Sequence, residues 1–197
     1  MMGREIEDRF DLSGSDLPEQ MEMEFYPRAI VPTISRNSPN KLVNRYWSLI
    51  PPYIKEVKEL KFSTFNAKTE TLREKNTYKQ SWNEAKRCIF PATYFIEWKK
   101  IMDGDKVVAK VPYMIKVKGR PIFGIAGLYE NEHETESATI ITTTPNKEMS
   151  EIHHRSPVIL SIEQEDLWLD KDTDLNIAFE MLEPPDDDSL EISELKR

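Results

Sequence analysis

Three short segments of the chain concentrate side chains that could perform chemistry. The first is Phe65-Asn66-Ala67-Lys68-Thr69-Glu70, which places an amide and a cation at the start of an expected helix. The positive end of a helix attracts anions, so Asn66 and Lys68 could orient a reacting group or hold a phosphate. Taken alone, the segment fits a helix cap at Asn66 and a solvated Lys68 better than a reactive site.

The second segment is Phe95-Ile96-Glu97-Trp98, in which one carboxylate follows two apolar residues and precedes a large aromatic ring. Desolvation there would raise the pKa of the Glu97 carboxyl and suit it to proton transfer near neutral pH. The alternative is a strand end with Glu97 in water and Trp98 packed in the core. The segment by itself does not separate the two.

The third segment, Glu151-Ile152-His153-His154-Arg155-Ser156-Pro157-Val158, places two of the three histidines and an arginine just before an apolar stretch. Histidine exchanges protons near physiological pH, and arginine binds phosphate through paired donors. We expect no metal, because the side chains of His153 and His154 should diverge and no second group of Cys, His and Asp supplies further ligands. The sequence also lacks a glycine-rich phosphate loop and a Gly-x-Ser-x-Gly motif, which disfavours nucleotide hydrolases and serine esterases, and we expect no cofactor.

The elements that must hold these segments together are mainly short strands. Thirteen prolines against six glycines, with clustered β-branched and aromatic residues, indicate an α+β fold of short strands joined by rigid turns. Helices are expected at residues 70–84 and, capped by Ser161, at residues 161–169. The remaining expectations are strands at 46–50, 88–91 and 94–98, a hairpin turn at 103–105, a half-buried edge strand at 113–117, and central strands at 122–129 and 138–142.

The net charge of −8 is unevenly distributed along the chain. Residues 161–197 contain thirteen Asp and Glu against three Lys and Arg, a net of −10, which leaves +2 for residues 1–160. Nucleic-acid binding normally draws on Lys and Arg, and this split leaves the body of the chain free to form a basic groove. We therefore predict one domain over residues 1–178 and an acidic C-terminal tail over residues 179–197, mobile from Pro184 onward.

The single cysteine, Cys88, cannot form an internal disulfide, which agrees with a reducing compartment. It is expected in the core rather than as a nucleophile. The chain has no run of about 18 apolar residues and no secretory signal pattern. We therefore expect a cytoplasmic, monomeric protein with no membrane partner.

In this order, the segments resemble those of the SRAP family, named for SOS response-associated peptidases and understood as abasic-site processing proteins. Met1-Met2-Gly3-Arg4 is similar to the family's Met-Cys-Gly-Arg, Tyr46-Trp47-Ser48-Leu49-Ile50-Pro51 to Arg-Trp-Gly-Leu-Ile-Pro, and Asn66-Ala67-Lys68-Thr69-Glu70 to Asn-Ala-Arg-x-Glu. Arg87-Cys88-Ile89-Phe90-Pro91-Ala92 with Phe95-Ile96-Glu97-Trp98 resembles Arg-Cys-Leu-Ile-Pro-Ala with Phe-Tyr-Glu-Trp. Residues 123–130 resemble Phe-Ala-Gly-Leu-Trp-Glu, and residues 152–160 resemble Ile-His-Asp-Arg-Met-Pro-Val-Ile-Leu.

The resemblance implies a compact, barrel-like sheet of short antiparallel strands with a groove for single-stranded DNA. In the family, the α-amino group and thiol of a cysteine at position 2 attack the aldehyde of a ring-opened abasic sugar, giving an imine and then a stable thiazolidine cross-link. Met2 stands at that position here. By the same resemblance, Glu97 transfers protons during sugar opening, His153 helps to form or reverse the imine, and Asn66 orients the reacting centre. The implied DNA contacts are Arg4, Lys68 and Arg155 to phosphates, and Trp47 and Trp98 beside the bases.

Three departures from the family pattern bear on activity. Met2 has a thioether, which cannot close a thiazolidine, so we expect no stable cross-link by the family's route. An α-amine with a pKa of about 7.7 to 8.0 is still partly neutral at physiological pH, which leaves a reversible imine or a lyase reaction open. Lys68 in place of an arginine loses a paired phosphate contact, and His154 stands where the family has an aspartate.

Three functions follow from these observations as alternatives. The first is an abasic-site enzyme of the DNA damage (SOS) response, which acts on single-stranded DNA through its N-terminal amine. The second is a catalytically inactive module that binds single-stranded DNA. The third is a peptidase, a hydrolase acting on its own N-terminus, and it ranks lowest because the only thiol is that of Cys88.

Overall fold

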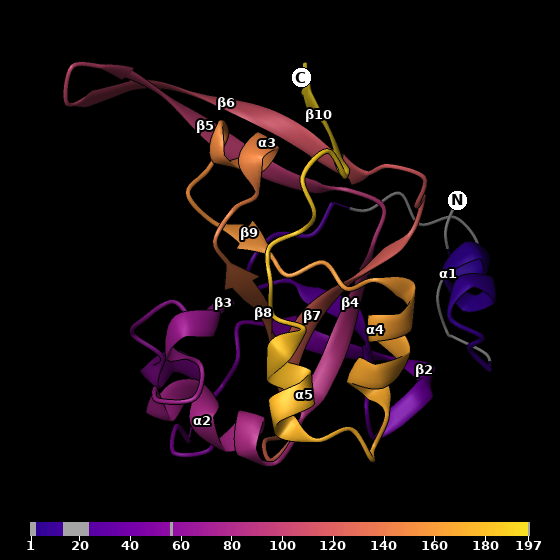
Figure 1. The fold of residues 1–197 in the computed structure, drawn as a ribbon. Helices are drawn as coiled ribbons and strands as arrows, with labels where there is room; N and C mark the ends of the chain where they lie inside the picture. The colour runs from indigo at the N-terminus through magenta and orange to yellow at the C-terminus, as the bar shows by residue number, and fades with distance from the viewer. Residues whose placement is uncertain (1–2, 14–23, 56, 197) are drawn as a thin grey trace.

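The computed structural model describes residues 3–13, 24–55 and 57–196, and it shows a mostly antiparallel sheet that closes on itself (Figure 1). The strand order is β2-β1-β4-β7-β8-β3, and β9 also pairs with β8. A parallel pairing of Tyr46 and Trp47 in β2 with Ser137 and Ala138 in β8 joins the start of this path to its fifth strand. The strands are β1 (Ile30–Ser35), β2 (Ser38–Trp47), β3 (Asn66–Lys68), β4 (Arg87–Ala92), β7 (Phe123–Glu130), β8 (Ser137–Thr143) and β9 (Ser156–Pro157).

A second sheet of three strands has the order β10-β6-β5. Its strands are β5 (Phe95–Asp103), β6 (Lys106–Val117) and β10 (Leu190–Glu194). The hairpin predicted at Asp103-Gly104-Asp105 is confirmed, since Gly104 turns the chain with a φ of 57° that favours glycine. Beyond the reach of β10, β5 and β6 continue as a two-stranded ribbon that extends away from the body (Figure 1).

Three short helices, α2 (Asn76–Asn83), α4 (Ile162–Leu169) and α5 (Leu175–Glu180), cover one face of the larger sheet. The described chain also has α1 (Gly3–Arg9), α3 (Lys147–Ser150), whose Met149 packs against the smaller sheet, and 3-10 turns at Val57–Glu59 and Thr69–Thr71. Trp82 of α2 and Trp168 of α4 pack with Ile89 and Leu128 in the main core. Neighbouring strand positions such as Phe90 point to the opposite face, where a second apolar cluster forms. Because both faces are covered, β7 and β8 are buried along their whole length, as their apolar sequences predict.

Several positions of the motif segments stabilise the fold and do not line the cavity. The buried Arg87 donates to the carbonyl oxygens of Trp168 (2.7 Å) and Asp170 (2.9 Å) at the end of α4, where backbone carbonyls have no partner within the helix. Trp168 in turn donates its indole N–H to the carbonyl of Cys88 at 2.9 Å. A Cβ at Gly127 would lie 2.5 Å from the Phe90 ring, so this close approach requires glycine.

Ser161 caps α4 as expected, and its capping box includes Gln164. The helix expected at residues 70–84 is shorter. A 3-10 turn comes first, then Leu72 turns into the core, and α2 begins only at Asn76. The strand expected at residues 46–50 ends at Trp47.

The prediction of a mobile tail from Pro184 is wrong. Leu190 to Glu194 form β10, which pairs with β6, and Leu190 is 4% exposed beside Ile115 and Met149. The alternation of Leu190 and Ile192 among acidic residues gives the segment one apolar face, and burial of that face offsets the cost of ordering it. Residues 113–117 are for this reason central in their sheet and not its edge. The boundary expected at residue 178 falls inside α5.

Candidate functional site

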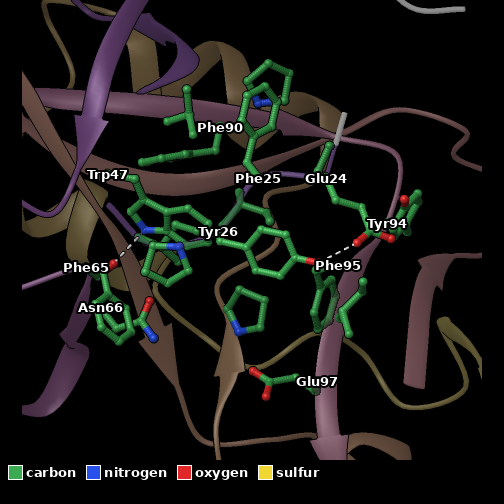
Figure 2. Close-up of a pocket in the computed structure, with 18 of the residues that line it drawn as sticks. Glu24, Phe25, Tyr26, Trp47, Phe65, Asn66, Phe90, Tyr94, Phe95 and Glu97 are labelled. Carbon is green, nitrogen blue, oxygen red and sulfur yellow. Dashed lines mark hydrogen bonds between the residues drawn. The ribbon is translucent and has the colours of Figure 1, made fainter. Parts of the chain in front are cut away.

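A cavity of about 1000 Å³ lies where the start of β5 meets the larger sheet (Figure 2). This volume is at the upper end of the range typical of small-molecule sites, about 300–1,000 Å³. Five of the residues singled out in the sequence line it: Trp47, Asn66, Glu97, Trp98 and His153. These residues come from β2, β3, β5 and the segment after α3, so the fold joins four of the motif segments at one place.

Four candidate residues are not among those that line the cavity. Met2 falls outside the described residues. Arg4 is exposed on α1, whereas Ile6 on the same helix is buried and lines the cavity. Lys68 and Arg155 flank the site without being part of the cavity wall.

Glu97 has the electrostatic character expected of a proton-transfer group. Its side chain is 27% exposed, and burial raises the pKa of its carboxyl to about 7. The Nδ1 atom of His153 lies 3.8 Å from Oε2 of Glu97, too long for a hydrogen bond. At neutral pH the Glu97 carboxyl can therefore exchange a proton with a ligand in the cavity, with the His153 ring beside it. The alternative of Glu97 in open water with Trp98 in the core does not hold, since Trp98 is 40% exposed.

Ionisation of Glu97 is expected to weaken the fold. The carboxyl has a higher pKa when folded than its ordinary value of 4.5, so stability is lost as the pH rises from about 4.5 to about 7. We expect Glu97→Gln to raise the free energy of unfolding by about 2 kcal/mol at pH 8 and by little at pH 4. Thermal unfolding at both pH values measures this. The exposed Glu74→Gln serves as control, and an equal effect of Glu97→Gln at both pH values contradicts the expectation.

Asn66 is a strand residue and not a helix cap. It pairs in parallel with Ile140, and its carbonyl oxygen accepts a hydrogen bond from the Tyr78 hydroxyl at 3.1 Å. The preceding carbonyl, of Phe65, accepts one from the indole N–H of Trp47 at 2.9 Å. These backbone contacts fix the strand and leave the exposed Asn66 amide extending into the cavity (Figure 2).

Arg155 is held by a carboxylate. Its guanidinium makes a paired contact with Glu70, at 2.5 and 2.9 Å, and also donates to the carbonyl of Thr142 at 2.6 Å. The same contact lowers the pKa of the Glu70 carboxyl. Arg155 thereby ties its own segment to β8 and to the turn that follows β3, while Lys68 next to it is exposed.

Besides Trp47 and Trp98, the cavity wall contains six aromatic residues that were not singled out in the sequence. Figure 2 shows the ring of Tyr26 within this group, its hydroxyl donating to Glu24 at 2.6 Å. The other aromatic lining residues include Phe25, Phe65, Phe90, Tyr94 and Phe95. The only sequence signal for them was that aromatic residues flank each motif.

The expectation of a positively lined cleft is not met in the described part of the wall. Its acidic and basic side chains are Glu24, Glu97 and His153, with no lysine or arginine. The cations gather beside the cavity instead. The expected divergence of the two neighbouring histidines is also wrong, because the rings of His153 and His154 lie 4.3 Å apart and tilted by 47°. No metal-binding group of His, Cys, Asp and Glu occurs among the described residues.

Comparison with known proteins shows the family to which this chain belongs. The family profile described as SOS response associated peptidase (SRAP) matches residues 2–197. The chain belongs to the SRAP family. Abasic site processing protein YoqW of Bacillus subtilis is 40% identical over 168 residues, which cover 82% of this chain and 72% of YoqW.

Solved structures give the same result for the SRAP fold. A protein from Bacteroides thetaiotaomicron is 30% identical with a TM-score of 0.74, over 86% of this chain and 75% of its own. One from Bordetella bronchiseptica has a TM-score of 0.83 over 100% of this chain and 97% of its own, at 22% identity. Within the part of this SRAP chain that the structure describes, no helix has the length and apolarity to cross a membrane.

Proposed function

We propose that this SRAP protein processes abasic sites in single-stranded DNA, with the cavity as the place where the ring-opened sugar reacts. The observation that supports this most is the shared position of Asn66, Glu97 and His153 at one cavity, with a Glu97 pKa of about 7. The relatives named abasic site processing proteins support the same substrate. The lone buried Cys88 and these relatives favour a cytoplasmic role in the DNA damage response.

The proposed reaction uses the N-terminal amine as nucleophile. The neutral amine attacks the aldehyde carbon of the opened sugar and forms a carbinolamine. Protonated Glu97 gives its proton to the departing hydroxyl, which leaves as water, and the carbon–nitrogen double bond of the imine forms. His153 lies 3.8 Å from Glu97. It gives a proton back to the Glu97 carboxylate after imine formation, and it accepts a proton from Glu97 when the imine is hydrolysed. With Met2 at the family's cysteine position, the reaction stops at the reversible imine.

Borohydride trapping tests this proposal. Borohydride delivers hydride to the imine carbon and makes the link permanent, so abasic single-stranded DNA should give a covalent band. Intact DNA of the same sequence, and DNA whose abasic site carries no aldehyde, should give none. Absence of a band with the abasic strand refutes the enzymatic proposal.

A binding module without chemistry is the second candidate, and Met2 is the observation that favours it. It predicts tight binding of single-stranded DNA together with no trapped band. Fluorescence anisotropy with abasic and intact strands, run beside the trapping assay, separates the two candidates.

The peptidase candidate requires a reactive thiol, and Cys88 does not provide one. It is fully buried in β4, and burial raises the pKa of its thiol to about 12. We expect a thiol reagent to modify Cys88 only after denaturant unfolds the protein. We also expect Cys88→Ala to destabilise the fold by about 1–2 kcal/mol while the trapped band persists. Rapid modification of Cys88 in the folded protein would instead support the peptidase candidate.

A further inference from the structure

A second, smaller cavity of about 200 Å³ adjoins the first and shares Trp98 and His153 with it. Lys99 and Lys100 of β5 form one side, and residues 150–154, from the end of α3 onward, form the other. Its volume is below the range of about 300–1,000 Å³ that holds a drug-sized ligand, so it suits a small group and not a base with its sugar. We call this the histidine–lysine cavity, after Lys99, Lys100, His153 and His154.

The charges around this cavity are mostly positive. Among the described residues no carboxylate lies within ion-pair distance of Lys99 or Lys100, and Glu151 is the one acid in the described wall. Lys100 stands directly opposite Lys110 in the β5–β6 ribbon, an unfavourable pairing of like charges. The pKa of His154 is lowered, first by its slight burial and then by nearby positive groups. These groups are His153, Lys100, Lys68 and Arg155.

A bound anion would relieve the repulsion among these positive groups, and the hydrogen-bond donors present suit an anion with several acceptor oxygens. The two imidazole rings are 4.3 Å apart and could each donate an N–H to one small group. Arg155 is already paired with Glu70, so His154 and Lys100, whose charge acts on His154, are the donors left for a ligand. The aspartate that the family pattern has at position 154 would instead repel an anion.

We propose that the histidine–lysine cavity binds a phosphomonoester, either the terminal phosphate of a DNA strand end or free phosphate. A phosphomonoester carries a charge of about −1.5 to −2 at pH 7, more than the single charge of an internal phosphodiester, and presents three acceptor oxygens. A phosphate bound there would lie next to the larger cavity, where the sugar is proposed to react, because His153 lines both cavities. The strand-end form of the proposal rests on the proposed action on abasic DNA, whereas the phosphate binding does not.

Titration of inorganic phosphate against the intact protein tests the binding, with the imidazole NMR signals of the three histidines as the readout. We expect the signals of His153 and His154 to shift, and the pKa of His154 to rise by about one unit because an opposite charge arrives beside it. His133, which contacts the Pro51 carbonyl and lines neither cavity, is an internal control and should not shift.

Variants locate the site. Loss of one charge-assisted hydrogen bond in Lys100→Gln should weaken phosphate binding about tenfold, and the negative charge of His154→Asp by more. Lys106→Gln removes the same charge from the ribbon but lines neither cavity, so its effect should stay within about twofold. Folding of each variant is checked by its melting temperature.

Oligonucleotides then distinguish the two sources of phosphate. Abasic single strands with a phosphate or a hydroxyl at the 5′ or 3′ end next to the abasic site are compared by anisotropy. If the protein binds a strand with one phosphorylated end about tenfold more tightly than its hydroxyl counterpart, and His154→Asp loses this preference, the ligand is the phosphate of that strand end. Histidine shifts with inorganic phosphate but no preference for either end assign free phosphate. Absence of histidine shifts overturns the proposal whatever the borohydride assay gives, and a failed borohydride assay leaves the phosphate result standing.

Discussion

Glutamine in place of Glu97 is expected to slow imine formation with abasic DNA by about 10²- to 10⁴-fold, the usual contribution of a positioned acid or base. Glutamine keeps the size and one carbonyl oxygen of the side chain, but its amide cannot give a proton to the departing hydroxyl. The measurement is the rate of borohydride trapping in a single turnover with saturating DNA. Affinity for the strand should change little, because the substitution removes no cation.

The pH dependence separates proton donation from a merely structural effect. Glu97 with a pKa of about 7 holds its proton below neutrality and loses it as the pH rises, so the acid is lost on the alkaline side. The amine, with an unperturbed pKa of about 7.7 to 8.0, becomes protonated as the pH falls, so the neutral nucleophile is lost on the acid side. The wild-type rate should therefore peak between these values, and Glu97→Gln should abolish the alkaline decline. Glu24→Gln alters the other carboxylate of the same wall and should leave the profile unchanged; a Glu97→Gln rate within threefold of wild type would contradict the role.

Cysteine in place of Met2 is expected to produce the second large effect, a covalent DNA link that survives heating without borohydride. The imine is reversible, but a neighbouring thiolate can add to its carbon and close a thiazolidine ring, which a thioether cannot do. Gel electrophoresis after heating detects the link. The expected change is from no heat-stable product to most of the protein linked.

Met2→Ala is the matched control for this gain of function. Initiator methionine is removed before a small residue, so the alanine and cysteine variants should both expose their amine at residue 2, which mass spectrometry verifies. Only the cysteine variant should give the heat-stable product, while both should give a borohydride band. If the cysteine variant has the exposed residue, binds DNA and forms no link, the reacting groups have diverged beyond the missing sulfur.

The sequence by itself determined the features that depend on neighbours along the chain. Residues 122–129 and 138–142 are nearly all apolar, so their burial as central strands followed from composition. The turn at Gly104 and the capping box of Ser161 and Gln164 follow from local backbone chemistry. The motif order was likewise enough to indicate the SRAP family, which the family profile confirmed.

Only the tertiary structure decided the features that depend on contacts between distant segments. The alternation of Leu190 and Ile192 is too short to predict a strand by itself, and only β6 shows what the segment pairs with, so an acidic stretch was mistaken for a tail. The contact of Arg155 with Glu70 joins residues 85 positions apart, and the pKa of Glu97 depends on burial that several elements create. Long-range packing sets the dielectric environment and the neighbours of each charge, and for that reason the cavity, its aromatic wall and the cations beside it could be read only from the folded chain.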